Sequence, residues 1–188
     1  EVGGSWQNSD ASVRQAVRTQ IEGGAMLDTS ATEEGNGGEI VVWSDITDPQ
    51  SLTTVNGTLL AKGGPHGGDG GRIETSGAEL ILEAGLKANA GSADGKAGLW
   101  LQDPFDYTID VSAASLISST LNSGTNVTVT TTAIDSNQGA TGEGSGDITV
   151  VASITKNSGA TSSLNLEADN DIFINQSISS TGDDGLNF

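Results

Sequence analysis

The chain has 188 residues, of which 27 are glycine, none is cysteine and 34% are apolar. Glycine, serine, threonine, asparagine and aspartate favour turns or strands over helix interiors, so this composition predicts many short strands joined by tight turns. The 25 acidic residues against 7 basic ones give a formal net charge of −18, which argues against nucleic acid and anionic membranes as partners. Without cysteine the fold cannot depend on disulfides, and no apolar run is long enough for membrane insertion.

Residues 12–21 carry two competing patterns. Val13, Val17 and Ile21 have the spacing of one helix face, and Asp10 is placed to cap such a helix. The repeats that follow favour a strand over residues 17–21 instead. We expect the strand, because tertiary context overrides local periodicity. The next strands are expected over residues 40–43, 53–61, 72–75 and 79–84.

Two glycine clusters read GNGGEI (35–40) and GDGGRI (68–73), and a weaker third reads GKAGLW (95–100). A phosphate-binding loop is excluded, because no Lys-Ser or Lys-Thr follows the last glycine and the following residues are better strands than helices. Each cluster instead follows a leucine-led segment at a spacing typical of solenoid repeats. The glycines are therefore predicted to be structural corners, namely Gly35, Gly37, Gly38, Gly68, Gly70, Gly71, Gly95 and Gly98.

From residue 104 the repeat has a different sequence. DITVVASI (147–154) matches DIFINQSI (171–178), and apolar residues at alternate positions fall on one face of a strand. Val127 and Val129 are expected to match Leu164 and Leu166 in the same way. Loop excursions are expected near residues 103–123 and 135–146. The stacked coils are predicted to form core columns of Ile148, Val150, Ile154, Ile172, Ile174 and Ile178.

The whole chain is predicted to be a single all-β segment of a larger protein. Four of its stretches resemble the secreted exoproteins of two-partner secretion, the group of filamentous haemagglutinin and the high-molecular-weight adhesins: GGSW (3–6), GNGGEIVVWSD (35–45), GGDGGRIETSG (67–77) and GKAGLWLQDPFDYTI (95–109). The resemblance implies a right-handed parallel β-helix, with glycine-corner coils over residues 1–103 and generic coils over 104–188. It also implies an outer-membrane transporter partner and a secreted or cell-surface location in a Gram-negative bacterium.

We expect a structural and adhesive rod segment, not an enzyme, that presents loops to a host cell, another bacterium or a matrix glycan. The alternative is a polysaccharide lyase or hydrolase, because parallel β-helices also host such enzymes. Glycoside hydrolysis needs two carboxylates facing one cleft. The closest pairs along the sequence are Asp45 with Asp48, and Asp103 with Asp106. Each pair contains an Asp-Pro step, which is better explained as the start of a turn.

The two tryptophans beside these pairs, Trp43 and Trp100, suggest a sugar platform but are better explained as covers of the core. His66, the only histidine, lies between glycines and is expected to be a solvated loop residue. No cofactor is expected. The acidic surface leaves weak Ca²⁺ binding between neighbouring carboxylates as an alternative to a solvated surface.

Three Asn-x-Ser/Thr sequons make Asn56, Asn126 and Asn175 candidate glycosylation sites. Chance is the simpler explanation in a chain so rich in these residue types. The first and last coils of a parallel β-helix would expose unpaired backbone groups, and an open edge of this kind templates further pairing. The sequence therefore predicts head-to-tail self-association, unless an irregular loop or a terminal strand blocks these edges.

Overall fold

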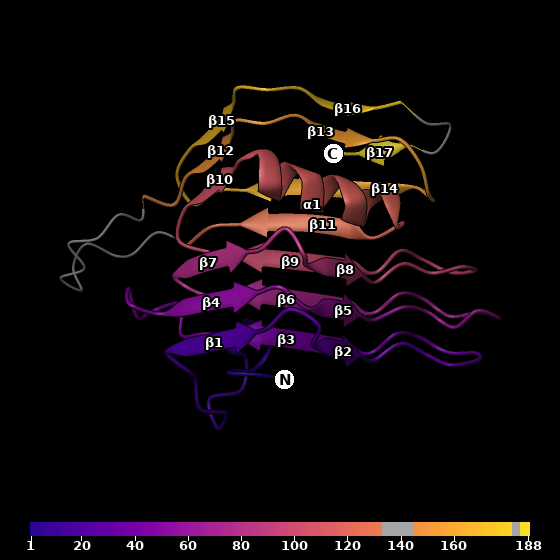
Figure 1. The fold of residues 1–188 in the computed structure, drawn as a ribbon, viewed down its shortest axis with the longest axis horizontal. Helices are drawn as coiled ribbons and strands as arrows, with labels where there is room; N and C mark the ends of the chain where they lie inside the picture. The colour runs from indigo at the N-terminus through magenta and orange to yellow at the C-terminus, as the bar shows by residue number, and fades with distance from the viewer. Residues whose placement is uncertain (133–144, 182–184) are drawn as a thin grey trace.

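The computed structural model describes residues 1–132, 145–181 and 185–188 (Figure 1). It is built mainly from short strands, and every pairing between its named strands is parallel. The elements follow one another in units of three, and most strands pair with the strand at the same position of the next unit. The predicted all-β class is therefore confirmed in strand content and parallel pairing.

The first three units contain strands only. They are β1 (Arg18–Ile21), β2 (Met26–Asp28), β3 (Glu39–Trp43); β4 (Leu52–Val55), β5 (Thr58–Leu60), β6 (Arg72–Ser76); and β7 (Glu79–Leu82), β8 (Lys87–Asn89), β9 (Leu99–Asp103). The fourth unit contains a helix: β10 (Tyr107–Ile109), α1 (Val111–Asn122), β11 (Asn126–Thr130). The last two units are β12 (Ile148–Val150), β13 (Ile154–Lys156), β14 (Ser162–Glu167); and β15 (Ile172–Ile174), β16 (Ile178–Ser180), β17 (Leu186–Asn187).

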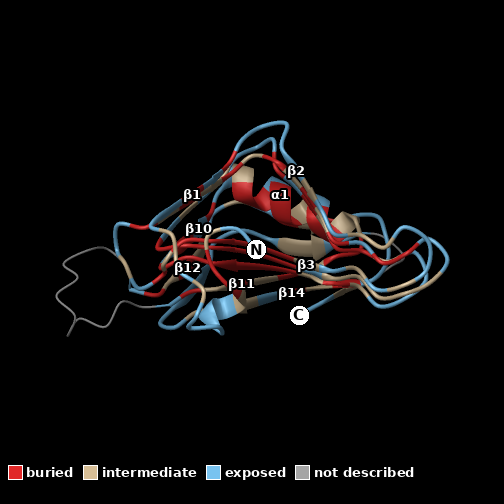
Figure 2. Cartoon of the chain, turned by 90° about the horizontal axis from the view of Figure 1, so that it is seen from below, coloured by how far each residue is buried: buried red, intermediate tan, exposed pale blue. Residues whose placement is uncertain are grey.

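One sheet runs through all six units, in the order β3-β6-β9-β11-β14-β17. The strands at the first position of each unit form two sheets, β1-β4-β7 and β10-β12-β15. The strands at the second position also form two sheets, β2-β5-β8 and β13-β16, which are separated by the fourth unit. Seen along the stack, the buried residues lie between these sheets (Figure 2). The continuous sheet therefore connects the lower and upper halves of the molecule.

Alternation along the continuous sheet separates core residues from residues on its outer face. Ile73 and Trp100 are aligned on neighbouring strands and both belong to the main core. The Trp100 indole N–H donates to Thr75 Oγ1 of the neighbouring strand at 3.1 Å, so the ring is both buried and hydrogen-bonded. Glu74 and Asp103 occupy alternate positions of β6 and β9 and lie outside this main core cluster.

Helix α1 occupies the second position of the fourth unit, where it contacts β8 on one side and β13 on the other. The Asp110 carboxylate caps it by accepting the Ala113 N–H at 2.9 Å. Apolar residues three and four positions apart face the core: Ala113, Ala114, Leu116, Ile117 and Leu121. The predicted loop excursion over residues 103–123 is therefore wrong, because a capped amphipathic helix packs there as part of the stack.

The predicted strand over residues 17–21 is confirmed as β1, and the competing helix is absent there. The single strand expected over residues 53–61 is wrong, because it divides into β4 and β5. Gly57 lies between them so close to the Ala25 carbonyl oxygen and to Ile21 that a Cβ would stand 2.7 Å from each. A residue with a side chain would not fit at this point between the two strands. Within the predicted excursion over residues 135–146, positions 135–144 lie outside the described residues.

The predicted columns are aligned in the structure: Ile148 pairs with Ile172, Val150 with Ile174, and Ile154 with Ile178, as do Val127 with Leu164 and Val129 with Leu166. Ile148, Val150 and Ile154 of unit 5 are fully buried, whereas Ile172 and Ile174, also predicted to lie in the core, are 42% and 52% exposed. The last two belong to unit 6, which is covered by a neighbouring unit on one side only.

Residues 2–9 run along and over the free edge of the continuous sheet. Val2 donates to the Val41 carbonyl at 2.8 Å, and its own carbonyl accepts the Trp43 N–H at 2.9 Å. A Cβ on Gly3 would collide with the Trp43 carbonyl oxygen, and a Cβ on Gly4 would collide with the Trp43 ring. These close approaches explain the two glycines of GGSW. The short 3₁₀ turn η1 (Trp6–Asn8) then crosses to the outer face of β6 and β9.

Candidate functional site

Three loops, residues 29–38, 61–71 and 90–98, project from the same side of the stack (Figure 1). We call them the stacked loops. Each is closed at its base by the same backbone hydrogen bond, from Gly38 to Thr29, from Gly71 to Ala61 and from Gly98 to Ala90, at 2.8, 2.7 and 2.9 Å. The three predicted glycine clusters therefore occupy equivalent places in three successive units.

The loops lie so close that their glycines leave no room for side chains. A Cβ on Gly70 would collide with the Ala90 carbonyl oxygen of the next loop. Gly68 has a φ of +116°, which L side chains rarely adopt, and it also lies against the Gly35 carbonyl. Backbone bonds join the loops, such as Gly37 N–H to the Asp69 carbonyl at 2.9 Å. These backbone N–H groups are used between loops, so they do not form a phosphate cradle.

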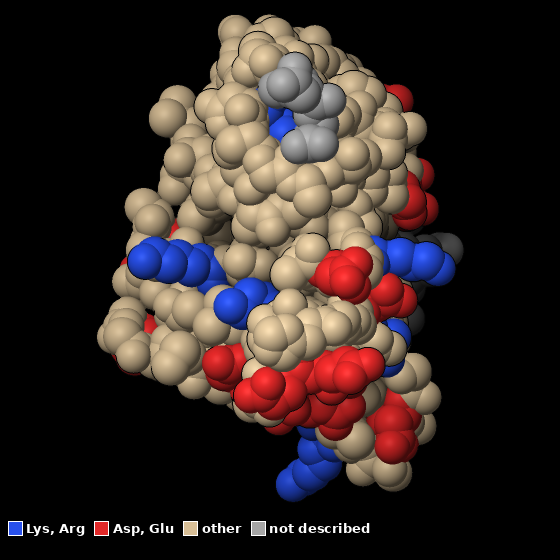
Figure 3. Space-filling model, turned by 90° about the vertical axis from the view of Figure 1, so that its right-hand side faces the viewer, with Lys and Arg blue, Asp and Glu red and all other residues tan. Residues whose placement is uncertain are grey.

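A groove of about 560 Å³ lies at the base of these loops and crosses several units. Its lining includes Asp28, Ser30, Lys62, Asn89 and Ser92, and it reaches Ser123 at the end of α1. Figure 3 shows the side from which the loops project, with acidic and basic side chains gathered over its lower half. The groove therefore spans more than one repeat and has both polar and apolar residues in its lining.

Three groups give the groove its chemistry. The Asp28 carboxylate accepts the Ser30 N–H at 2.9 Å, and this hydrogen bond, with a smaller contribution from the charge of Lys62, lowers the pKa of Asp28. Asn89 Oδ1 accepts the Gly91 N–H at 2.8 Å. Within the described residues, Asn89 Nδ2 and Lys62 Nζ have no hydrogen-bond partner. The groove thus offers two donors and one ionised acceptor to a ligand.

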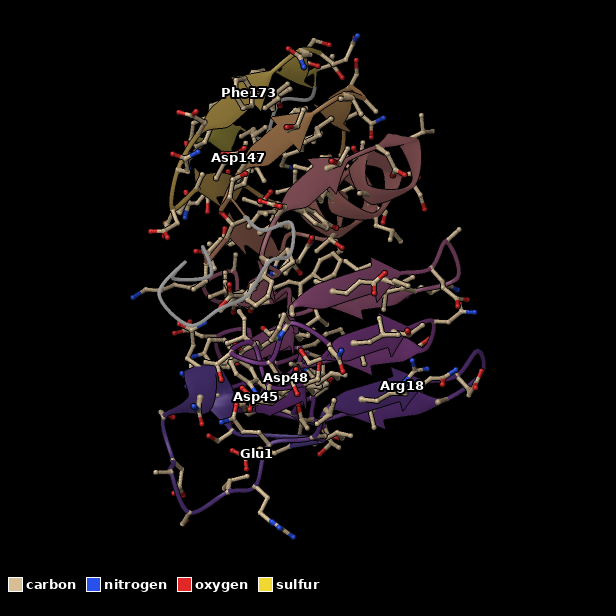
Figure 4. All side chains as sticks on the ribbon, turned by 90° about the vertical axis from the view of Figure 1, so that its left-hand side faces the viewer. Glu1, Arg18, Asp45, Asp48, Asp147 and Phe173 are labelled. Atoms are coloured by element: carbon tan, nitrogen blue, oxygen red, sulfur yellow. The ribbon has the colours of Figure 1, made fainter. Side chains whose placement is uncertain are left out.

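The two aspartate pairs considered from the sequence have other roles. Asp45 accepts the N–H and hydroxyl of Thr47, and Asp48 accepts the N–H of Gln50, so both stabilise turns. Figure 4 shows these two aspartates low on the left-hand side, far from Asp147. Asp106 accepts backbone N–H groups of the next unit. Asp45, Asp48 and Asp106 therefore hold backbone in place.

The structure instead brings together Asp103 and Glu74, through Gln7 of the N-terminal segment. Gln7 Nε2 lies 3.3 Å from Glu74 Oε1 and 3.3 Å from Asp103 Oδ2. Burial, then the charge of Glu74, raises the pKa of Asp103 to about 7, and burial also raises the pKa of Glu74. Sequence reasoning missed this pair, since its members lie on different units and are joined by a residue near the N-terminus.

Neither tryptophan offers an open platform for a sugar ring. Trp100 is fully buried in the main core. Trp43 is 2% exposed in a second cluster on the outer face, with Phe105 among its members. Its indole N–H donates to Gln15 Oε1 at 2.9 Å.

His66 is exposed in the second stacked loop, with Nε2 3.8 Å from Glu33 Oε2. Among the described residues, no group of three or more His, Asp or Glu side chains could hold a metal ion. Weak Ca²⁺ binding therefore stays a prediction, to be checked by melting the protein with and without Ca²⁺ at matched ionic strength.

The three sequon asparagines have different environments. Asn56 Nδ2 donates to Glu83 Oε2 at 2.6 Å. Asn126 is half-buried and joins two units, with Nδ2 3.3 Å from the Ala97 carbonyl and Oδ1 accepting the Ser163 N–H at 2.9 Å. Asn175 is exposed. A glycan on Asn126 would have to break contacts between units, whereas Asn175 is accessible.

Comparison with protein-family models and with curated proteins finds no match for this chain. None of the described helices is both long and apolar enough to cross a membrane.

Proposed function

We propose that the chain is a segment of a right-handed parallel β-helix that acts as a structural and adhesive rod in a larger secreted exoprotein. The regular parallel pairing from unit to unit supports this proposal, because stacking of such units extends a rod without limit of length. The resemblance to two-partner secretion exoproteins supports export by an outer-membrane transporter. It also supports a location at or beyond the surface of a Gram-negative bacterium.

The adhesive surface in this proposal is the groove beside the stacked loops, and the ligand is a glycan of a cell or matrix. The observation that carries it is a groove of about 560 Å³ with Lys62 and Asn89 as available donors and Asp28 as acceptor. Sugar hydroxyls both donate and accept hydrogen bonds, so they match this mixture. An extended chain of sugars also fits a groove that crosses several units.

A glycan array probed with the purified chain tests this function. We expect selective binding that is lost in the double variant Lys62→Ala/Asn89→Ala and kept in Lys96→Ala. Lys96 is a matched control, because it is an exposed lysine of the third stacked loop that does not line the groove. Absence of binding to every glycan, or equal binding by the double variant, would contradict the proposal.

The buried carboxyl pair is the one observation that favours the enzymatic alternative, since a carboxyl with a raised pKa can act as a general acid. Glu74 is fully buried and Asp103 is 6% exposed, and Gln7 covers both. A polysaccharide could reach them only after the N-terminal segment moves away. Incubation with acidic polysaccharides distinguishes the two functions, because new reducing ends that disappear in Asp103→Asn would favour the enzyme.

A further inference from the structure

Residues 5–9 cross the outer face of β6 and β9, and we call them the strap. Gln7 is its main attachment. The Gln7 backbone N–H donates to Glu74 Oε2 at 2.9 Å, and Nε2 reaches Glu74 and Asp103 at 3.3 Å each. Beside it, the guanidinium of Arg72 lies 4.2 Å from the centre of the Trp6 ring. The strap is thus held by Gln7, which binds two carboxyl groups, and by Trp6.

The backbone of the strap has a conformation that opposes closure. Gln7 and Asn8 have φ values of +47° and +50°, in the left-handed region that residues other than glycine rarely adopt. Such strain persists only where surrounding contacts maintain it. The contacts of Gln7 with the carboxyl pair therefore help to hold this conformation in place.

The carboxyl pair lies in an unfavourable place for two negative charges. Asp103 also accepts from Thr132 Oγ1 at 3.4 Å, and Glu74 accepts from Ser76 Oγ at 3.0 Å, which are both neutral donors. The other charged groups nearby leave the pair unneutralised. Glu39 of β3 repels Glu74 and pairs with Arg72, and Asp10 beyond the strap is bonded to Ser12.

We propose that residues 5–9 form a proton-controlled strap, which closes over Glu74 and Asp103 when the pair holds a proton and opens when both carboxyls are ionised. The direction follows from linkage. In the closed arrangement, burial and then the charge of Glu74 raise the pKa of Asp103 to about 7, although the hydrogen bonds from Thr132 and Gln7 act in the opposite direction. Exposure of Asp103 to water would return its pKa toward the ordinary value of 3.8. The closed strap therefore binds a proton that the open strap releases, so closure is favoured below about pH 7 and weakened above it.

Opening has a structural consequence on the same face. Trp6 packs against the outer apolar cluster, which consists of Val41, Trp43, Ile46, Ala78 and Phe105. Departure of the strap would uncover this cluster together with the carboxyl pair. A face that is closed in acid would become an apolar and acidic surface at alkaline pH.

The three tryptophans of the chain provide a direct probe. We would incorporate fluorotryptophan and follow the three ¹⁹F resonances from pH 5 to pH 9, with Trp6 assigned from a Trp6→Phe variant and the core residue Trp100 as an internal reference. We expect the Trp6 resonance to shift with a midpoint near pH 7, as for Asp103. Exchange of the Gln7 amide hydrogen, corrected for its intrinsic pH dependence, should accelerate over the same range.

The variant Asp103→Asn should remove this titration, and Asp94→Asn should leave it unchanged, since Asp94 is an exposed carboxylate of the third stacked loop. A Trp6 resonance that is constant with pH, an unaltered midpoint in Asp103→Asn, or a constant corrected exchange rate at Gln7 would overturn the proposal. If Asp103→Asn does not fold, Glu74→Gln takes its place. That change should lower the midpoint, because the Glu74 charge contributes to the raised pKa of Asp103, and an unchanged midpoint would also overturn the proposal.

Discussion

The carboxylate of Asp106 accepts the backbone N–H of Asp147 in the next unit, with 2.9 Å between Oδ1 and N. One unit further on, Asp147 Oδ1 accepts the N–H of Asp171 at 3.0 Å. In two successive units, an aspartate side chain thus accepts the backbone N–H of the equivalent aspartate in the next unit. Stacking of the last three units is therefore supported by Asp106 and Asp147, which lie just before the first strands of the fourth and fifth units, in addition to the sheets themselves.

Removal of this contact should weaken the stack. Asp106→Ala deprives the backbone N–H groups of Gly146 and Asp147 of their acceptor, and we expect the free energy of unfolding to fall by about 1 kcal/mol. Urea denaturation followed by circular dichroism measures it. Asp94→Ala is the control for loss of one negative charge, and an equal effect in both variants would contradict the role of Asp106.

A side chain at the base of the stacked loops should be poorly tolerated. The Cβ of Gly70→Ala would collide with a backbone oxygen, which cannot move without shifting the neighbouring loop. We expect a loss of stability of roughly 1–3 kcal/mol, as for other overpacked sites. Gly23→Ala is the control, because its Cβ would meet only the flexible Asn56 side chain at 3.2 Å. Equal melting temperatures for the two variants would be evidence against tight loop stacking.

Gln102 should be replaceable by an apolar residue with a gain in stability. It is fully buried, and neither its Nε2 nor its Oε1 has a hydrogen-bond partner among the described residues. A buried unpaired polar group costs about 1–3 kcal/mol. Gln102→Met keeps a similar shape, so we expect the free energy of unfolding to rise by roughly 1 kcal/mol. A decrease would show that the amide makes a stabilising contact.

Global stability should fall as the pH rises toward neutrality. The pKa of Asp103 is raised from 3.8 to about 7 in the folded chain, so the folded state holds a proton that the unfolded state has released. Its contribution is largest below the unfolded value and is lost as the pH rises through about 7. At about 1.4 kcal/mol per pH unit, the loss from pH 5 to pH 8 is about 2–3 kcal/mol. Urea unfolding at both pH values should show it, and Asp103→Asn should abolish it.

Stability should also fall in strong acid, for a different group of carboxylates. Hydrogen bonds lower the pKa values of Asp10, Asp28 and Asp147. The stability that these groups contribute is present above their ordinary value of 3.8 and is lost as the pH falls through their lower folded values. The two effects together place the maximum of stability between about pH 4 and pH 7.

Head-to-tail association should occur through the exposed face of the sixth unit. Ile172 and Ile174 are 42% and 52% exposed there, and open strand edges favour pairing with a further strand. Salt should strengthen the contact by screening a net charge of −18. We expect Ile172→Lys or Ile174→Lys to reduce the scattering mass at high salt, and Val111→Lys, a change at an exposed residue of α1, to leave it unaltered. A monomer at high concentration and high salt would contradict this prediction.

Much of the stacking could be predicted from the sequence alone. The alternation of apolar residues indicated that residues 147–154 align with residues 171–178. The structure has the same register between β12 and β15 and between β13 and β16. The glycine clusters likewise marked three equivalent loops. These features are visible in a sequence because each repeat meets the same neighbours, so the same residue types recur at the same positions.

Only the tertiary structure revealed the features that are not repeated. Helix α1 packs where other units have a strand, and its capped amphipathic pattern was hidden by the surrounding repeats. Gln7, Glu74 and Asp103 meet through contacts between residues 67 and 96 positions apart. Their proximity, their burial and the raised pKa of Asp103 all depend on the strap that covers the sheet. Periodicity predicts which residues face the core, whereas the folding of one irregular segment onto the outer face decides which carboxyl groups lose contact with water.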